Sequence, residues 1–72
     1  MMIPHDWRNY IRFVSVGGET IQAKKILSVA EGCAHARSAL SIPGIDRIVV
    51  VMDGEAWYEY SKEYPEGERL IE

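Results

Sequence analysis

This chain of 72 residues lacks the cross-links that stabilise many very small proteins. It has one cysteine, Cys33, so no disulfide can form within the chain, and a lone thiol is typical of a reducing compartment. Cysteine and histidine do not cluster at the spacing of metal ligands. Because a domain of this size buries only about 60% of its unfolded surface, a partner or a second copy could contribute to its stability. We expect one domain spanning 1–72.

Long apolar runs are also missing. None approaches the ~20 residues that span a bilayer, and the first residues, MMIPHDWRNY, do not have the pattern of a secretory signal. We therefore expect no membrane association and a soluble protein of the cytoplasm. The chain is 47% hydrophobic, which is too apolar for a disordered segment.

Catalytic and cofactor-binding patterns are absent as well. Cys33 and His35 are two positions apart on a predicted helix, so they point in different directions and cannot hold one ion. Gly17-Gly18 has neither the spacing nor the following helix of a phosphate-binding loop. We predict no catalytic residues, no metal, no cofactor and no enzymatic activity.

The strongest pattern that is present predicts a hairpin over 47–61, RIVVVMDGEAWYEYS. Asp53-Gly54 between two apolar runs is typical of a tight turn. A two-residue loop would pair Met52 with Glu55, so we predict a three-residue loop, Asp53 to Glu55, with a bulge at Gly54. The resulting pairs are Met52/Ala56, Val50/Tyr58 and Ile48/Tyr60, which give one wholly apolar face. The opposite face carries Val49, Val51, Trp57 and Glu59.

Two strands are predicted before this hairpin. Trp7–Val16 is rich in strand formers, with Trp7, Ile11 and Phe13 on the inner side. Gly17-Gly18 then forms a turn into Glu19–Lys25, whose inner side carries Ile21 and Ala23.

A helix is predicted from Ser28 to about Leu40. Ser28 and Glu31 fit a capping box, in which each side chain accepts a hydrogen bond from the other residue's amide. Val29, Cys33, Ala36 and Leu40 recur at helical spacing and should face the sheet. Because these and neighbouring residues are mostly small, the helix can lie close to the sheet, and large side chains below it must fill the space.

After the hairpin, Tyr64–Gly67 is a turn and Arg69–Ile71 a possible short edge strand. The chain is therefore predicted to be an α+β domain in ββαββ order. Its sheet has four or five antiparallel strands, and one α-helix packs on one face.

Charge is unevenly distributed and suggests a working surface. Residues 1–45 carry five basic and three acidic residues, or +2, whereas 46–72 carry three basic and eight acidic residues, or −5. An acidic half suits a basic partner, and tryptophan with valine on an uncovered sheet face is typical of a protein-binding surface. We predict that another protein is bound by Val49, Val51, Trp57, Glu55, Glu59 and Glu63.

Two alternatives remain open. Basic and aromatic residues alternate on the first strand and at the end of the second, as in sheets that stack bases and hold phosphates. A nucleic acid would then be bound by Arg8, Tyr10, Arg12, Lys24 and Lys25. The other alternative is a structural module that forms a homodimer through the Trp57 face.

The run YIRFV…GETIQAKKILSVAEGCAHA…IDRIVVVMDGEAWYEY resembles some small phage-encoded anti-CRISPR proteins. The resemblance covers about Arg8 to Tyr64 and rests on the order and size of the elements. It implies a non-enzymatic inhibitor, made in a bacterial host cell, that docks on a basic nucleic-acid-binding surface of a Cas surveillance complex. Such an inhibitor would block target DNA. The resemblance assigns no binding residue, because no motif matches position by position.

Overall fold

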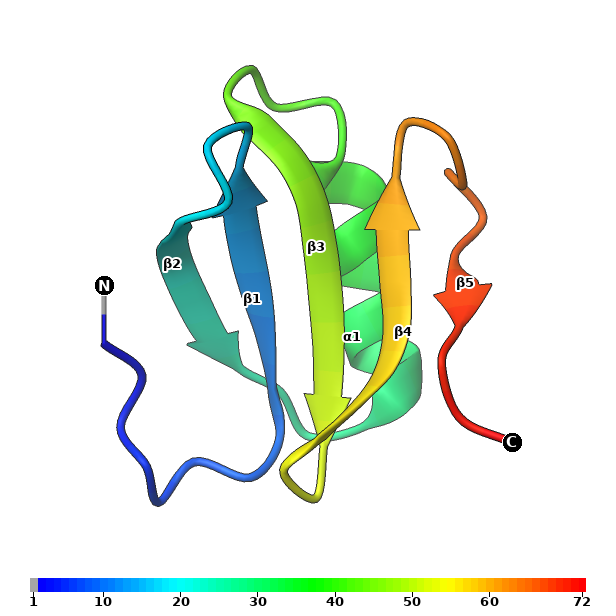
Figure 1. The fold of residues 1–72 in the computed structure, drawn as a ribbon. Coiled ribbons are helices and arrows are strands. Elements are labelled where there is room, and N and C mark those ends of the chain that lie inside the picture. The colour runs from blue at the N-terminus through cyan, green and yellow to red at the C-terminus, as the bar shows by residue number, and fades with distance from the viewer. Residues whose placement is uncertain (1) are drawn as a thin grey trace.

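A computed structural model describes residues 2–72 as five strands and one helix (Figure 1). The elements are β1 (Tyr10–Ser15), β2 (Thr20–Lys25), α1 (Val29–Ala39), β3 (Ile45–Met52), β4 (Glu55–Ser61) and β5 (Glu68–Arg69). The strands form one sheet in the order β2-β1-β3-β4-β5, and every neighbouring pair is antiparallel. The predicted α+β fold is confirmed, and the optional fifth strand is present, although it spans Glu68–Arg69 and not 69–71 as predicted.

The core lies between α1 and one face of the sheet, which we call the inner face. In Figure 1 the helix lies behind the sheet, and it packs chiefly on β3 with further contacts to β1 and β4. Ala36 and Leu40 are buried from the helix side, and Val29 and Cys33 pack against the same cluster, as the helical spacing predicted. The sheet contributes the larger side chains, namely Ile11, Phe13, Ile48, Val50, Tyr60 and part of Tyr58.

Gly32 is the point of closest approach between α1 and the sheet. A Cβ atom added there would lie 2.6 Å from Ile26 Cδ1, 3.0 Å from Val50 Cγ1 and 3.3 Å from Ile11 Cγ2. A side chain at this position fits only if Ile26 and Val50 shift, so the glycine permits the close approach even though it weakens a helix. The small size of the helix residues was predicted to permit close packing, but the particular role of Gly32 was not.

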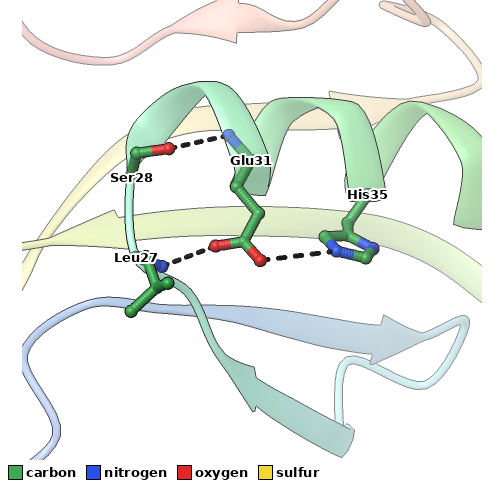
Figure 2. A network of polar contacts seen from close by, with 4 residues as sticks. All are labelled: Leu27, Ser28, Glu31 and His35. Atoms are coloured by element: carbon green, nitrogen blue, oxygen red, sulfur yellow. Dashed lines mark hydrogen bonds and ion pairs between the residues drawn. The ribbon is translucent and has the colours of Figure 1, made fainter.

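The helix begins at Ser28, whose hydroxyl accepts a hydrogen bond from the Glu31 amide at 3.1 Å (Figure 2). The other half of the predicted capping box is wrong: the Glu31 carboxylate accepts from the amide of Leu27 at 2.6 Å. The same carboxylate lies 3.8 Å from His35 Nε2, one turn along the helix. The Leu27 side chain is 93% exposed, because the residue it would pack against in a hydrophobic staple is Gly32.

The β3–β4 hairpin differs from the prediction at its turn and agrees with it further along. Asp53 and Gly54 form a two-residue turn with φ of 53° and 79°, and Met52 does pair with Glu55. This turn suits Asp-Gly because both residues tolerate positive φ. The register then shifts between Val50 and Val51, so the extra residue is absorbed by a bulge inside β4. Beyond the bulge, the predicted pairs Val50/Tyr58 and Ile48/Tyr60 are confirmed.

The first two strands also depart from the predicted faces. Strand β1 starts at Tyr10, so the alternation that assigned Trp7 to the inner side does not apply. Trp7 instead contacts Tyr10 and Lys25, which face away from the helix. Ala23 pairs with Arg12 and therefore lies on that face too, while Ile21 falls at the register shift and is 49% exposed.

Candidate functional site

The face of the sheet opposite α1, which we call the outer face, is the candidate functional surface. No helix or strand crosses it in Figure 1. Val14, Val49 and Val51 form a small apolar cluster there, and Tyr10 packs against it. The three valines are nevertheless 1%, 3% and 5% exposed. The sheet thus covers its own second apolar cluster without another layer.

The strand register places long polar side chains beside Val49, where they can contribute to this cover. Val49 pairs with Arg12 on β1 and with Glu59 on β4, so the aliphatic parts of both side chains can lie beside it. The Arg12 guanidinium donates to Thr20 Oγ1 at 3.1 Å, and Arg47 Nη1 lies 3.5 Å from Glu59 Oε1. A partner would therefore meet these polar groups before it reached the valines that the sequence pattern had suggested as contact area.

Trp57 lies at the β4 bulge and is half-buried. Its carbonyl accepts the Leu70 amide at 2.8 Å, which holds the C-terminal segment beside β4. The predicted tyrosine orientation is confirmed, since Tyr58 and Tyr60 belong to the inner cluster. Trp57 belongs to neither apolar cluster and stays half-buried on β4.

The three acidic residues predicted as a group are spread along β4. Glu55 begins the strand and pairs with Met52, while Glu63 lies in the bend that follows it. The six residue steps of β4 from Glu55 to Ser61 cover roughly 20 Å at about 3.3 Å per residue, and Glu63 lies beyond that end of the strand. Only Glu59 lies on the outer face close to Val49, so the structure does not bring the three carboxylates together.

Glu59 has a closer acidic neighbour that the sequence analysis missed. In the β4–β5 ladder it pairs directly with Glu68. Like charges that face each other across a ladder are destabilising, and among the residues described only Glu59 of the two has an ion-pair partner. The pair was missed because the edge strand was predicted over 69–71, which leaves out Glu68.

The residues predicted as an alternative nucleic-acid-binding surface do not all lie on one face of the sheet. Tyr10, Arg12 and Lys25 share the outer face, since Tyr10 pairs with Lys25 and the face alternates along β1. Lys24 pairs with Ile11 and so projects from the other face. The backbone of Arg8 is tied to the hairpin turn: its carbonyl accepts the Gly54 amide at 2.9 Å.

The sheet order separates charge across the molecule. Residues 6–25, which include β1 and β2, carry four basic and two acidic residues, or +2. Residues 55–72, which include β4 and β5, carry two basic and six acidic residues, or −4. Because β2 and β5 are the opposite edges of the sheet, we call these regions the basic side and the acidic side.

The inner face contains one perturbed titratable group, the phenol of Tyr60. Burial raises the pKa of Tyr60 to about 12, and the Cys33 thiol adds to this shift while Arg37 opposes it. Arg37 Nη1 lies 3.5 Å from the phenolic oxygen. Tyr60 as a whole is 2% exposed and belongs to the core cluster, so its interactions are structural.

Residues 2–72 contain no group of three or more histidine, cysteine, aspartate or glutamate side chains placed to hold a metal ion. In the same part of the chain, no helix has the length and apolar character needed to span a membrane. A hollow on the exposed side of α1 is lined by Glu31, Ala34, His35 and Ser38, which supply only the weak surface pair described above. No protein-family model, curated protein or solved structure matches this chain.

Proposed function

We propose that this protein binds a basic surface of another protein through the acidic side of its outer face. The observation that supports this most directly is the Glu59–Glu68 pair. Two carboxylates face each other across a strand ladder, and among the described residues only Glu59 of the two has an ion-pair partner, the Arg47 guanidinium. A cationic partner would relieve this repulsion, so the pair contributes more to binding than to folding.

Trp57 extends the proposed contact. It lies on β4 two positions before Glu59 and is half-buried, so an aromatic residue precedes one of the two carboxylates on the same strand. Aromatic residues near the centre of a charged rim are typical of the groups that contribute most binding energy. Val49 and Val51 support this surface from beneath, because they are almost wholly covered.

The resemblance to anti-CRISPR proteins gives the proposal a particular partner. On this proposal the protein acts in the cytoplasm of a bacterial host cell and is an inhibitor, not an enzyme. Its acidic side occupies a basic nucleic-acid-binding surface of a Cas surveillance complex and thereby excludes target DNA. A purified complex of this kind should bind less target DNA when the protein is added.

The variant E59Q/E68Q tests the proposed surface. Removing the facing charges should relieve about 0.2–1 kcal/mol of repulsion, partly offset by the loss of the weak Arg47–Glu59 ion pair, while weakening inhibition of target-DNA binding. E19Q is the matched control, because Glu19 is an exposed acid in the β1–β2 turn on the other side of the sheet. Inhibition by E59Q/E68Q at the level of the unmodified protein would contradict the proposed surface. Failure of all three proteins to inhibit would contradict the proposed partner.

A further inference from the structure

A second group of side chains lies at the opposite side of the outer face. It consists of Trp7, Tyr10, Arg12 and Lys25, and we call it the aromatic–basic cluster. The ring centroids of Trp7 and Tyr10 are 6.2 Å apart, with an angle of 56° between the rings. Lys25 Nζ lies 5.4 Å from the centroid of the Trp7 ring, and Arg12 lies two positions from Tyr10 on the same face of β1.

The segment that carries Trp7 is held in place by backbone hydrogen bonds on both sides. The Trp7 amide donates to the Pro4 carbonyl at 3.0 Å, and the Arg8 carbonyl accepts from Gly54 at 2.9 Å. Asn9 makes two contacts with distant parts of the chain. Its carbonyl accepts the Ile26 amide at 3.2 Å, and its side-chain oxygen accepts the Asp53 amide at 2.9 Å. The aromatic pair is therefore positioned before any ligand binds, which lowers the entropy cost of binding.

The charges around this cluster favour an anionic ligand. It lies on the basic side of the sheet, and the six acidic residues of 55–72 belong to the other side. Arg12 uses one guanidinium nitrogen to contact Thr20, and an arginine has five donors in all. Lys25 is exposed and has no ion-pair partner among the residues described.

We propose that the aromatic–basic cluster binds single-stranded nucleic acid. Bases stack on Trp7 and Tyr10, and the Lys25 ammonium and Arg12 guanidinium pair with the phosphates. A base that stacks on Trp7 displaces Lys25 from the ring, and the ammonium is then free to reach the phosphate of the same nucleotide. An acidic peptide would satisfy the two cations but would leave both aromatic faces without a planar partner, whereas every base has one.

Fluorescence titration tests this proposal directly, because the chain has two tryptophans. In W57F, Trp7 is the sole tryptophan and should be quenched by short oligothymidylate and oligouridylate, the two probes that separate DNA from RNA. With two phosphates neutralised, the logarithm of the binding constant should fall with the logarithm of the salt concentration with a slope of about −1.4. In W7F, Trp57 should report no quenching, and anisotropy of a labelled oligomer should give an affinity about 5- to 150-fold weaker.

K25Q and K62Q form a matched pair that separates a specific contact from general charge. Both replace an exposed lysine, but Lys62 follows β4 at the other end of the molecule. K25Q should reduce the slope by about 0.7, whereas K62Q should leave it unchanged. K25Q also tests the cluster without altering an aromatic residue, should W7F fold poorly.

Several outcomes would overturn the proposal. These are no quenching of Trp7 by either oligomer at low salt, equal slopes for K25Q and K62Q, and equally strong quenching by oligoglutamate. Light scattering that showed a salt-sensitive dimer with Trp7 already quenched would assign the cluster to a second copy of the chain instead. The binding of oligomers by E59Q/E68Q should equal that of the unmodified protein, so this test is independent of the proposed protein partner.

Discussion

Moving one methyl group from Ile26 to Gly32 tests how closely α1 approaches the sheet. A Cβ atom on residue 32 would lie 2.6 Å from Ile26 Cδ1, closer than two nonbonded carbon atoms can approach, so the two groups compete for the same space. I26V removes that methyl group and should cost about 1 kcal/mol, as is usual for this truncation in a core. G32A alone adds a methyl group to a filled space, at a cost of about 1–3 kcal/mol, offset by a gain of about 1 kcal/mol in helix propensity.

The double variant I26V/G32A should then be far more stable than the sum of the single changes predicts. The added methyl group replaces the deleted one, and the gain in helix propensity remains. The contact of 3.0 Å with Val50 Cγ1 is relieved by a small shift. We expect the double variant to lie within about 1 kcal/mol of the unmodified protein, with a coupling energy of about 2 kcal/mol between the two sites.

Urea unfolding followed by circular dichroism measures the four free energies needed for this cycle. A34G is the control for helix propensity, because Ala34 is exposed on the same helix, and it should lose about 1 kcal/mol. Additivity of I26V and G32A within about 0.5 kcal/mol would refute the close approach of helix and sheet, because separated sites do not couple.

Two further predictions concern the start of α1 and the buried tyrosine of the core. S28A should lower the free energy of unfolding by about 1 kcal/mol in thermal or urea unfolding, because the Glu31 amide loses its acceptor, whereas S38A on the exposed helix surface should have little effect. Stability should also fall at high pH: the pKa of Tyr60 is raised to about 12, so folding favours the neutral phenol. This contribution is complete below about pH 10, the ordinary pKa of tyrosine, and is lost as the pH rises through about 12. Y60F should abolish that loss, and an unchanged pH profile in Y60F would contradict the assignment.

The fold was predictable because several local patterns agreed with one another. Apolar residues at helical spacing, the serine cap and the Asp-Gly turn each indicated an element, and together they allowed one arrangement of a helix on an antiparallel sheet. The inner face was predicted correctly in β3 and β4, since the pairs Val50/Tyr58 and Ile48/Tyr60 bury apolar surface in only one register.

The candidate site was less predictable because it depends on irregular backbone. The sequence predicts a three-residue turn, whereas the structure has a two-residue turn and a bulge inside β4. Both place one extra residue on the β4 side, so the strand pairs from Val50/Tyr58 onward are the same. Trp7 lies before β1, where strand alternation carries no information. Asn9 contacts Asp53, a residue 44 positions away, and no local pattern reveals such a contact.

The exposure of Val49 and Val51 was misjudged for a different reason. Strand alternation correctly assigned them to the face opposite the helix, but exposure depends on the neighbours across the ladder. The register places Arg12 and Glu59 on either side of Val49. Long polar side chains can cover small apolar ones, and their effect could be predicted only once all three strands had been aligned.

The position of β1 between β2 and β3 has a consequence for biosynthesis. Residues made first occupy the interior of the sheet, and their second neighbour, β3, is translated only after the helix is complete. An isolated two-stranded hairpin is marginally stable in water, so the nascent β1–β2 unit has little independent structure on the ribosome. Folding of the sheet therefore waits until α1 and β3 have emerged, and a polypeptide that stops within α1 should be a ready substrate for cellular proteases.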